Sequence, residues 1–95
     1  MAISISDIEY TPNPMVAGKK VKATCKVTAD EEMQSVKIYD PEYRALEAKD
    51  VEGNGVYMLE TDVPYDAPPG TYYITVVATD KKGDTERKSV SIKIG

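Results

Sequence analysis

Carboxylates gather in three short segments of this chain, and they are the side chains whose spacing could support chemistry. The segments are residues 30–32, 50–54 and 80–84. Calcium takes six to eight oxygen ligands, which loop carboxylates can supply. The candidate calcium ligands are Asp30, Glu32, Asp80 and Asp84.

A plainer interpretation of these acids stays open beside calcium. None of the three segments has a complete calcium-loop spacing. Lys81 and Lys82 fall within the same group and would oppose a bound cation. Asp and Gly are also ordinary turn residues, so the acids need no metal to explain them. Calcium is the one cofactor considered, and otherwise none is expected.

Other catalytic chemistry has little to build on. The chain has no His, which removes the usual general base and a common metal ligand. Cys25 is the single cysteine, so neither an internal disulfide nor a Cys-rich zinc site can form. Neither a nucleophile–base pair nor a Gly-rich phosphate loop is evident. We therefore expect a protein that is not an enzyme.

The elements that position these residues are predicted to be β-strands. In residues 19–28, Val21, Ala23, Cys25 and Val27 alternate with polar residues, which indicates a strand with one buried face. The same alternation predicts further strands at 35–39, 55–63, 71–79 and 85–94.

Two segments are less regular. In residues 3–10 the apolar residues change from odd positions (Ile3, Ile5) to even positions (Ile8, Tyr10). A bulge or a sheet switch near Ser6 and Asp7 would let all of them face the same side. Residues 42–49 predict a short strand, with a helical turn as the alternative. Residues 52–55 and 81–84 resemble hairpin connections, and residues 65–70 a stiffer crossover. The result is an all-β, seven-stranded antiparallel sandwich of Greek-key type without a disulfide.

One face of the predicted sandwich carries tyrosines. Tyr39, Tyr73 and Val77 are expected to point outward from it. Tyr is large, rigid and amphipathic, which makes it a frequent contact residue at interfaces. The face could bind a protein or a glycan, although isolated exposed apolar groups are also normal on surfaces.

Three stretches carry a family resemblance. They are YTPNPMVAGKKVK at 10–22, GVYMLETDVP at 55–64 and PGTYYITVVATD at 69–80. Together they resemble the bacterial and archaeal immunoglobulin-like (fibronectin-III-like) domains that occur in tandem on surface and secreted proteins. The resemblance implies an immunoglobulin-like fold and an extracellular or cell-surface location.

The resemblance also implies structural roles for three residues. Gly70 and Tyr72 match the corner at which a Tyr hydroxyl bonds to nearby backbone. Cys25 matches the first cysteine of the antibody pattern, but Ile74 stands where the second would be. We therefore expect Cys25 to be a buried free thiol.

The remaining expectations concern partners. The net charge of −4 disfavours nucleic acid, and the chain lacks an apolar run long enough for membrane insertion. An odd number of antiparallel strands places the two ends at opposite poles. Residues 1–95 are thus interpreted as one monomeric domain excised from a longer protein, a spacer whose partners are neighbouring domains. The alternative is an adhesive or glycan-binding module.

Overall fold

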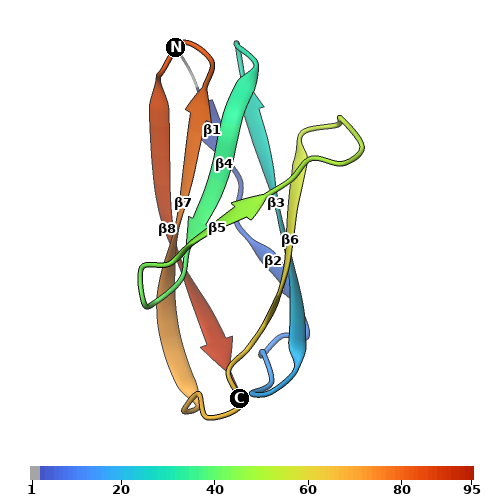
Figure 1. Cartoon of the computed structure of the whole chain (residues 1–95), viewed down its shortest axis with the longest axis vertical. Helices are drawn as coiled ribbons and strands as arrows, with labels where there is room; N and C mark the ends of the chain where they lie inside the picture. Colours follow the sequence, from blue (N-terminus) through green and yellow to red (C-terminus); the bar gives the residue numbers. More distant parts are fainter. Residues whose placement is uncertain (1–2) are drawn as a thin grey trace.

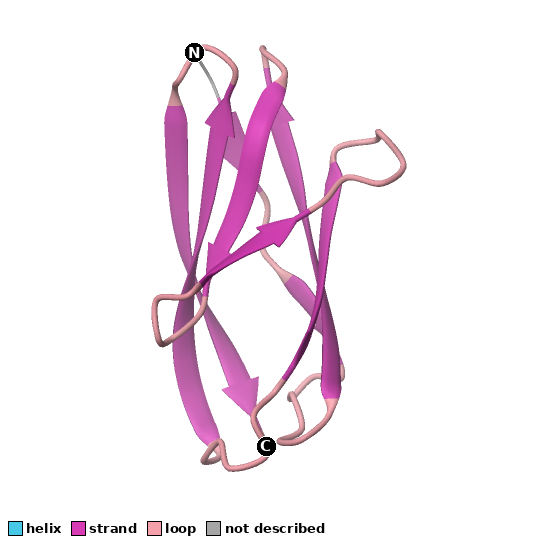
Figure 2. Ribbon diagram, in the orientation of Figure 1, coloured by secondary structure: helices cyan, strands magenta, loops and turns pink. Residues whose placement is uncertain are grey.

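The chain folds into eight strands. A computed structural model describes residues 3–95, so Met1, interpreted from the sequence as an added start, lies outside the described residues. Figure 2 shows only strands and loops in this part of the chain. The strands are β1 (Ile3–Ile5), β2 (Glu9–Thr11), β3 (Lys20–Ala29), β4 (Met33–Tyr39), β5 (Ala45–Ala48), β6 (Val56–Asp62), β7 (Gly70–Asp80) and β8 (Thr85–Ile94).

The strands form two antiparallel sheets. In one sheet β3 pairs with β1 and β2 along one edge and with β6 along the other. In the other sheet the order is β5-β4-β7-β8. The predicted all-β sandwich is therefore confirmed in its architecture. The count of seven strands is wrong by one, because the first predicted strand is two strands, β1 and β2.

A β-bulge separates β1 from β2. Ile5 pairs with Val27 and Glu9 pairs with Thr24, so four steps along one chain face three along the other. The extra residue restores the inward direction of the apolar side chains, since Ile3 and Ile5 precede it and Ile8 and Tyr10 follow it, all packed in or against the core. Both halves pair with β3, so of the two expected explanations the bulge is correct and the sheet switch is not.

The core lies between the two sheets and follows the alternation of the sequence. Val21, Cys25 and Val27 of β3 face inward from one sheet. Ile74, Val76 and Ala78 of β7 face them from the other, with Val36 and Ile38 of β4. Period-two alternation works here because successive side chains of a strand point to opposite faces.

The ambiguous segment at residues 42–49 contains the strand β5. Ala45 to Ala48 pairs with Tyr39 to Val36 of β4, so the helical alternative is wrong. The following loop, expected to be a hairpin, instead leads from one sheet to the other. A single antiparallel bridge between Lys49 and Met58 is the only pairing that links β5 with β6 in the described chain.

The molecule is elongated along its strands, with extents of 40 × 23 × 18 Å. β1 and β2 run in the same direction along β3, so the extra strand adds no reversal of the chain. Figure 1 accordingly shows the start of β1 near one end of the long axis and the C-terminus at the other. Within the described part of the chain, no helix is long and apolar enough to cross a membrane.

Candidate functional sites

Two acids of residues 30–32, one of them the candidate calcium ligand Glu32, form ion pairs with lysines. Lys81 Nζ lies 2.8 Å from Glu32 Oε2, and Lys82 Nζ lies 3.5 Å from Glu31 Oε2. The hydrogen bond and the charge of Lys81 lower the pKa of Glu32, and the same contact raises the pKa of Lys81. These pairs join the β3–β4 turn to the β7–β8 turn.

Asp80 serves as a turn cap. Sequence alternation ended the predicted strand at Thr79, but β7 continues to Asp80, whose side chain is fully buried. Its Oδ1 accepts hydrogen bonds from the backbone N–H groups of Lys82 and Asp84, each at 2.9 Å. Its Oδ2 has no hydrogen-bond partner among residues 3–95. Asp80 continues the even-numbered series of Ile74, Val76 and Ala78, which point inward. Because side chains alternate along a strand, this position was the sequence signal that Asp80 also points inward.

The four candidate calcium ligands are not brought together. Asp30 and Asp84 are exposed, Glu32 binds Lys81, and Asp80 binds backbone. Among the described residues no three carboxylate or thiol groups are close enough to hold a metal ion. Of the four, Asp80 is the one whose side chain caps a turn.

Asp50 caps the loop that leads into β6, a role that sequence analysis missed. Its Oδ2 accepts from the N–H of Gly55 at 2.8 Å and its Oδ1 from the N–H of Asn54 at 3.1 Å. The bond from Gly55 is the main cause that lowers the pKa of Asp50. An Asp shortly before a Gly-rich turn is the sequence signal for such a cap.

The tyrosine face is only partly as expected. Tyr73 is 68% exposed, and Tyr39 is half-buried opposite Thr75. Val77 is only 9% exposed, so its prediction as an accessible contact residue is wrong. It lies between Lys37 and Arg87 on the neighbouring strands, whose long aliphatic stems can cover it.

Tyr72 makes the bond that the resemblance implies. Its hydroxyl donates to the backbone oxygen of Pro68 at 2.6 Å. Gly70 has φ +155°, a conformation that residues with a side chain rarely adopt. Cys25 is buried and free, and burial raises the pKa of its thiol. A buried protonated thiol packs as a small apolar group and is a poor nucleophile.

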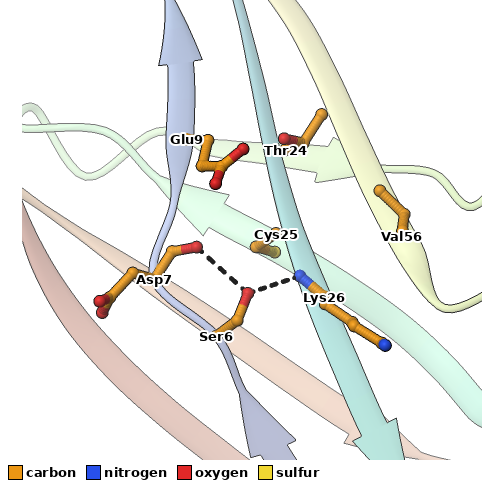
Figure 3. Close-up of a pocket in the computed structure, with 7 residues that line it drawn as sticks. All are labelled: Ser6, Asp7, Glu9, Thr24, Cys25, Lys26 and Val56. Atoms are coloured by element: carbon orange, nitrogen blue, oxygen red, sulfur yellow. Dashed lines mark hydrogen bonds between the residues drawn. The ribbon is translucent and has the colours of Figure 1, made fainter.

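A shallow hollow of about 300 Å³ marks the β-bulge. Figure 3 shows the Ser6 hydroxyl at its edge, accepting from the backbone N–H of Lys26 at 2.8 Å and donating to the backbone oxygen of Asp7 at 3.1 Å. The serine replaces part of the interrupted ladder. We interpret the hollow as a consequence of the bulge, because the Ser6 hydroxyl at its edge already bonds to the backbone on both sides.

A larger cleft opens between the two sheets, and sequence analysis did not anticipate it. It has a volume of about 520 Å³. We call it the inter-sheet cleft. Apolar residues of both sheets line it, among them Val21, Ala23, Leu59, Ile38, Leu46 and Ile74.

Comparisons with known proteins add support for the fold. No family model and no curated protein matches the chain. Among solved structures, fibronectin(III)-like modules of Clostridium thermocellum CbhA match with a TM-score of 0.67 at 16% identity, over 96% of this chain and 94% of theirs. A Niemann-Pick type C2 protein from the Japanese carpenter ant matches with a TM-score of 0.58 at 12% identity, over 96% and 91%.

A third match is to part of an enzyme. The endo-beta-1,4-mannanase from Thermotoga petrophila matches with a TM-score of 0.75 at 16% identity. The match spans all of this chain but only 20% of the mannanase. At these identities the likeness shows an immunoglobulin-like, fibronectin-III-like fold.

Proposed function

We propose that this domain is a non-catalytic structural module, a spacer within a longer extracellular or cell-surface protein. The observation that carries the proposal is the placement of the start of β1 and the end of β8 at opposite ends of a 40 Å long axis. A module of this form adds length when its neighbours are attached at both ends.

The comparisons support a modular role. One matching structure is itself described as a fibronectin(III)-like module, and another contains the fold as a fifth of a larger chain. The family resemblance of the sequence supports the extracellular location.

The hydrogen bonds of the domain support the absence of catalysis. Within residues 3–95 the hydroxyl groups of Ser6, Tyr72 and Thr79 bond to backbone or to another hydroxyl, and no hydroxyl bonds to a carboxylate. A nucleophile of the serine or threonine type requires an adjacent base.

Small-angle X-ray scattering of two copies joined end to end tests the proposal. The expected maximum dimension of the joined protein is close to twice the 40 Å axis of one copy. This value assumes that the two copies do not pack against each other. A compact particle in which the copies pack side by side would contradict a spacer role. A single copy measured alongside serves as the reference.

A binding module is the second candidate, favoured by the exposure of Tyr73 on a regular strand. Amide chemical shifts recorded during titration with a glycan panel test it. Shifts at Tyr73 and Tyr39 that disappear in Tyr73→Ala would support binding on this face. Unchanged spectra would remove glycans as its ligands.

A further inference from the structure

The inter-sheet cleft results from the strand register. β4 ends at Tyr39, which pairs with Thr75, whereas β7 begins five residues earlier, at Gly70. At about 3.3 Å per residue, roughly 16 Å of β7 lacks a β4 partner. β6 by contrast follows β3 as far as the pair of Lys20 with Asp62. The two sheets therefore overlap unevenly, and one side of the core is left open.

The side chains of the core do not close this opening. The chain has neither Phe nor Trp. Ala23 and Val21 line the cleft on one sheet and Ile74 on the other. Apolar walls that face an unfilled space lose dispersion contacts, which a ligand of matching shape would restore. Small-molecule sites are mostly apolar and span roughly 300–1,000 Å³, a range that includes the 520 Å³ of this cleft.

The rim of the cleft is acidic. Asp40 and Glu42 border it from the β4–β5 turn, and Asp62 and Asp66 from the end of β6 and the loop that follows. Arg44 is the only cation of the lining, and its Nε already lies 2.8 Å from Asp40 and its Nη2 3.2 Å from Glu42. Asp62 lies 3.5 Å from Lys20 Nζ in an exposed pair, and Asp66 forms no ion pair among residues 3–95. Four carboxylates against two cations leave the rim with a net negative charge, which favours a ligand with a positive charge.

Two exposed tyrosines stand in the loops that border the rim. Tyr43, in the β4–β5 turn, and Tyr65, in the β6–β7 loop, are each 86% exposed. Tyr43 has φ +66°, an uncommon conformation for a residue with a large side chain. Aromatic faces attract cations such as an ammonium group. Neither ring belongs to the lining of the cleft, so the preference for a cation rests on the net charge of the rim.

We propose that the inter-sheet cleft binds a small amphipathic cation, with its apolar body between the sheets and its ammonium group at the acidic rim. The lining includes Ile94 at the end of β8, so the site lies beside one pole of the molecule, but binding a small molecule there is a function distinct from the spacer role.

Amide chemical-shift titration with octylamine, which is protonated at pH 7, tests the proposal. Octanoate and octanol serve as matched probes of opposite and zero charge. Shifts confined to residues around Leu46, Leu59 and Ile74, with octylamine binding at least about tenfold more tightly than octanoate, are expected. Equal affinities, or shifts elsewhere on the surface, would overturn it.

Two variants test separately how the apolar body and the charged head of the ligand contribute to binding. Thr61→Leu places a larger apolar group in the cleft and should weaken all binding without lowering the thermal midpoint. The double variant Asp62→Asn with Asp66→Asn should weaken octylamine about threefold or more and leave octanol unchanged. Glu47→Gln on β5, outside the cleft, is the control. Unchanged octylamine affinity in both cleft variants would refute the site.

A different occupant would give a different result. If the free edge of β7 pairs with a second copy of the chain, the amine probe should not bind and the protein should dimerise with rising concentration in analytical ultracentrifugation. That outcome would overturn the small-molecule site while leaving the scattering test of the spacer unaffected.

Discussion

Asp40, Asp50 and Asp80 share one task at the ends of three strand segments. Each accepts backbone N–H groups from the turn that follows it, at distances of 2.8–3.1 Å. An Asp side chain bonded in this way fixes the turn and satisfies donors that would otherwise depend on water. The acids of this chain therefore serve mainly as turn caps.

Asp50 should make the stability of the domain depend on acid pH. The pKa of Asp50 is lowered in the folded state. Its contribution to the free energy of unfolding is therefore fully present above the ordinary Asp pKa of about 4 and is lost as pH falls through the lower pKa of the folded state. Asp50→Asn should lose less stability than the wild type as pH falls from about 5 through the ordinary Asp pKa of about 4 and on into the more acid range.

Urea midpoints measured across that window check the prediction. Glu52→Gln is a suitable control, because Glu52 lies in the same loop and its side chain makes no hydrogen bond or ion pair among residues 3–95. Parallel pH dependences of wild type and Asp50→Asn would count against the capping role.

Cys25 should resist thiol reagents in the folded protein. Its side chain is buried, and its raised pKa reduces the reactive thiolate, so labelling requires opening of the structure. We expect labelling by a disulfide reagent at pH 8 to be at least about 100-fold slower in native buffer than in denaturant. Comparable rates in the two conditions would show an accessible thiol.

The elements show how far alternation alone defines a strand. β8 has the limits predicted from sequence, Thr85–Ile94, although burial alternates only from Lys88 onward and Thr85–Arg87 are all exposed. β4 begins at Met33, before the predicted residue 35, because a register irregularity between Met33 and Ser35 breaks the alternation. The bulge between β1 and β2 could be predicted because apolar residues on both sides of it report the change of parity.

Other features depend on contacts that one strand cannot report. Val77 is buried where the sheet places Lys37 and Arg87 on either side of it, an arrangement that the sequence of one strand does not show. The inter-sheet cleft depends on where β4 stops against β7, which is a property of register between distant segments. Sequence patterning thus predicted most of the strands, left the acids open between calcium ligands and turn residues, and could not predict the cleft.

The corner at the start of β7 should contribute measurably to stability. Tyr72→Phe removes the hydroxyl that donates to the Pro68 oxygen and should cost about 1 kcal/mol of unfolding free energy. Urea unfolding measures this cost. Tyr73→Phe is the matched control, because the Tyr73 hydroxyl makes no hydrogen bond in the described chain. Equal effects of the two substitutions would argue against a role for the corner.

At the scale of the whole molecule, stability rests on a core of aliphatic residues shared by two sheets. Val76 and Ala78 are fully buried, and the core lacks Phe and Trp altogether. In a core of small side chains no single residue makes many contacts. The stability of the domain therefore depends on close packing between the two sheets along their whole length.

Val76→Ala should destabilise the domain by about 2 kcal/mol, because it removes two buried methyl-sized groups and leaves a cavity. Val56→Ala, at a position that is 37% exposed, should cost much less. Thermal and urea unfolding of both variants provide the comparison. A small effect at Val76 would mean that the sheets readily collapse around the missing groups.

The bulge at Ser6 and Asp7 has a mechanical consequence for a chain held at both ends. Tension along the long axis would pull β1 lengthwise past β3, so that its backbone bonds resist together in shear. Because the bulge interrupts that ladder, β1 would separate from β3 before β2 does. The hydrogen bond between the Ser6 hydroxyl and the Lys26 N–H would have to break before the force acts on the pairing of β2.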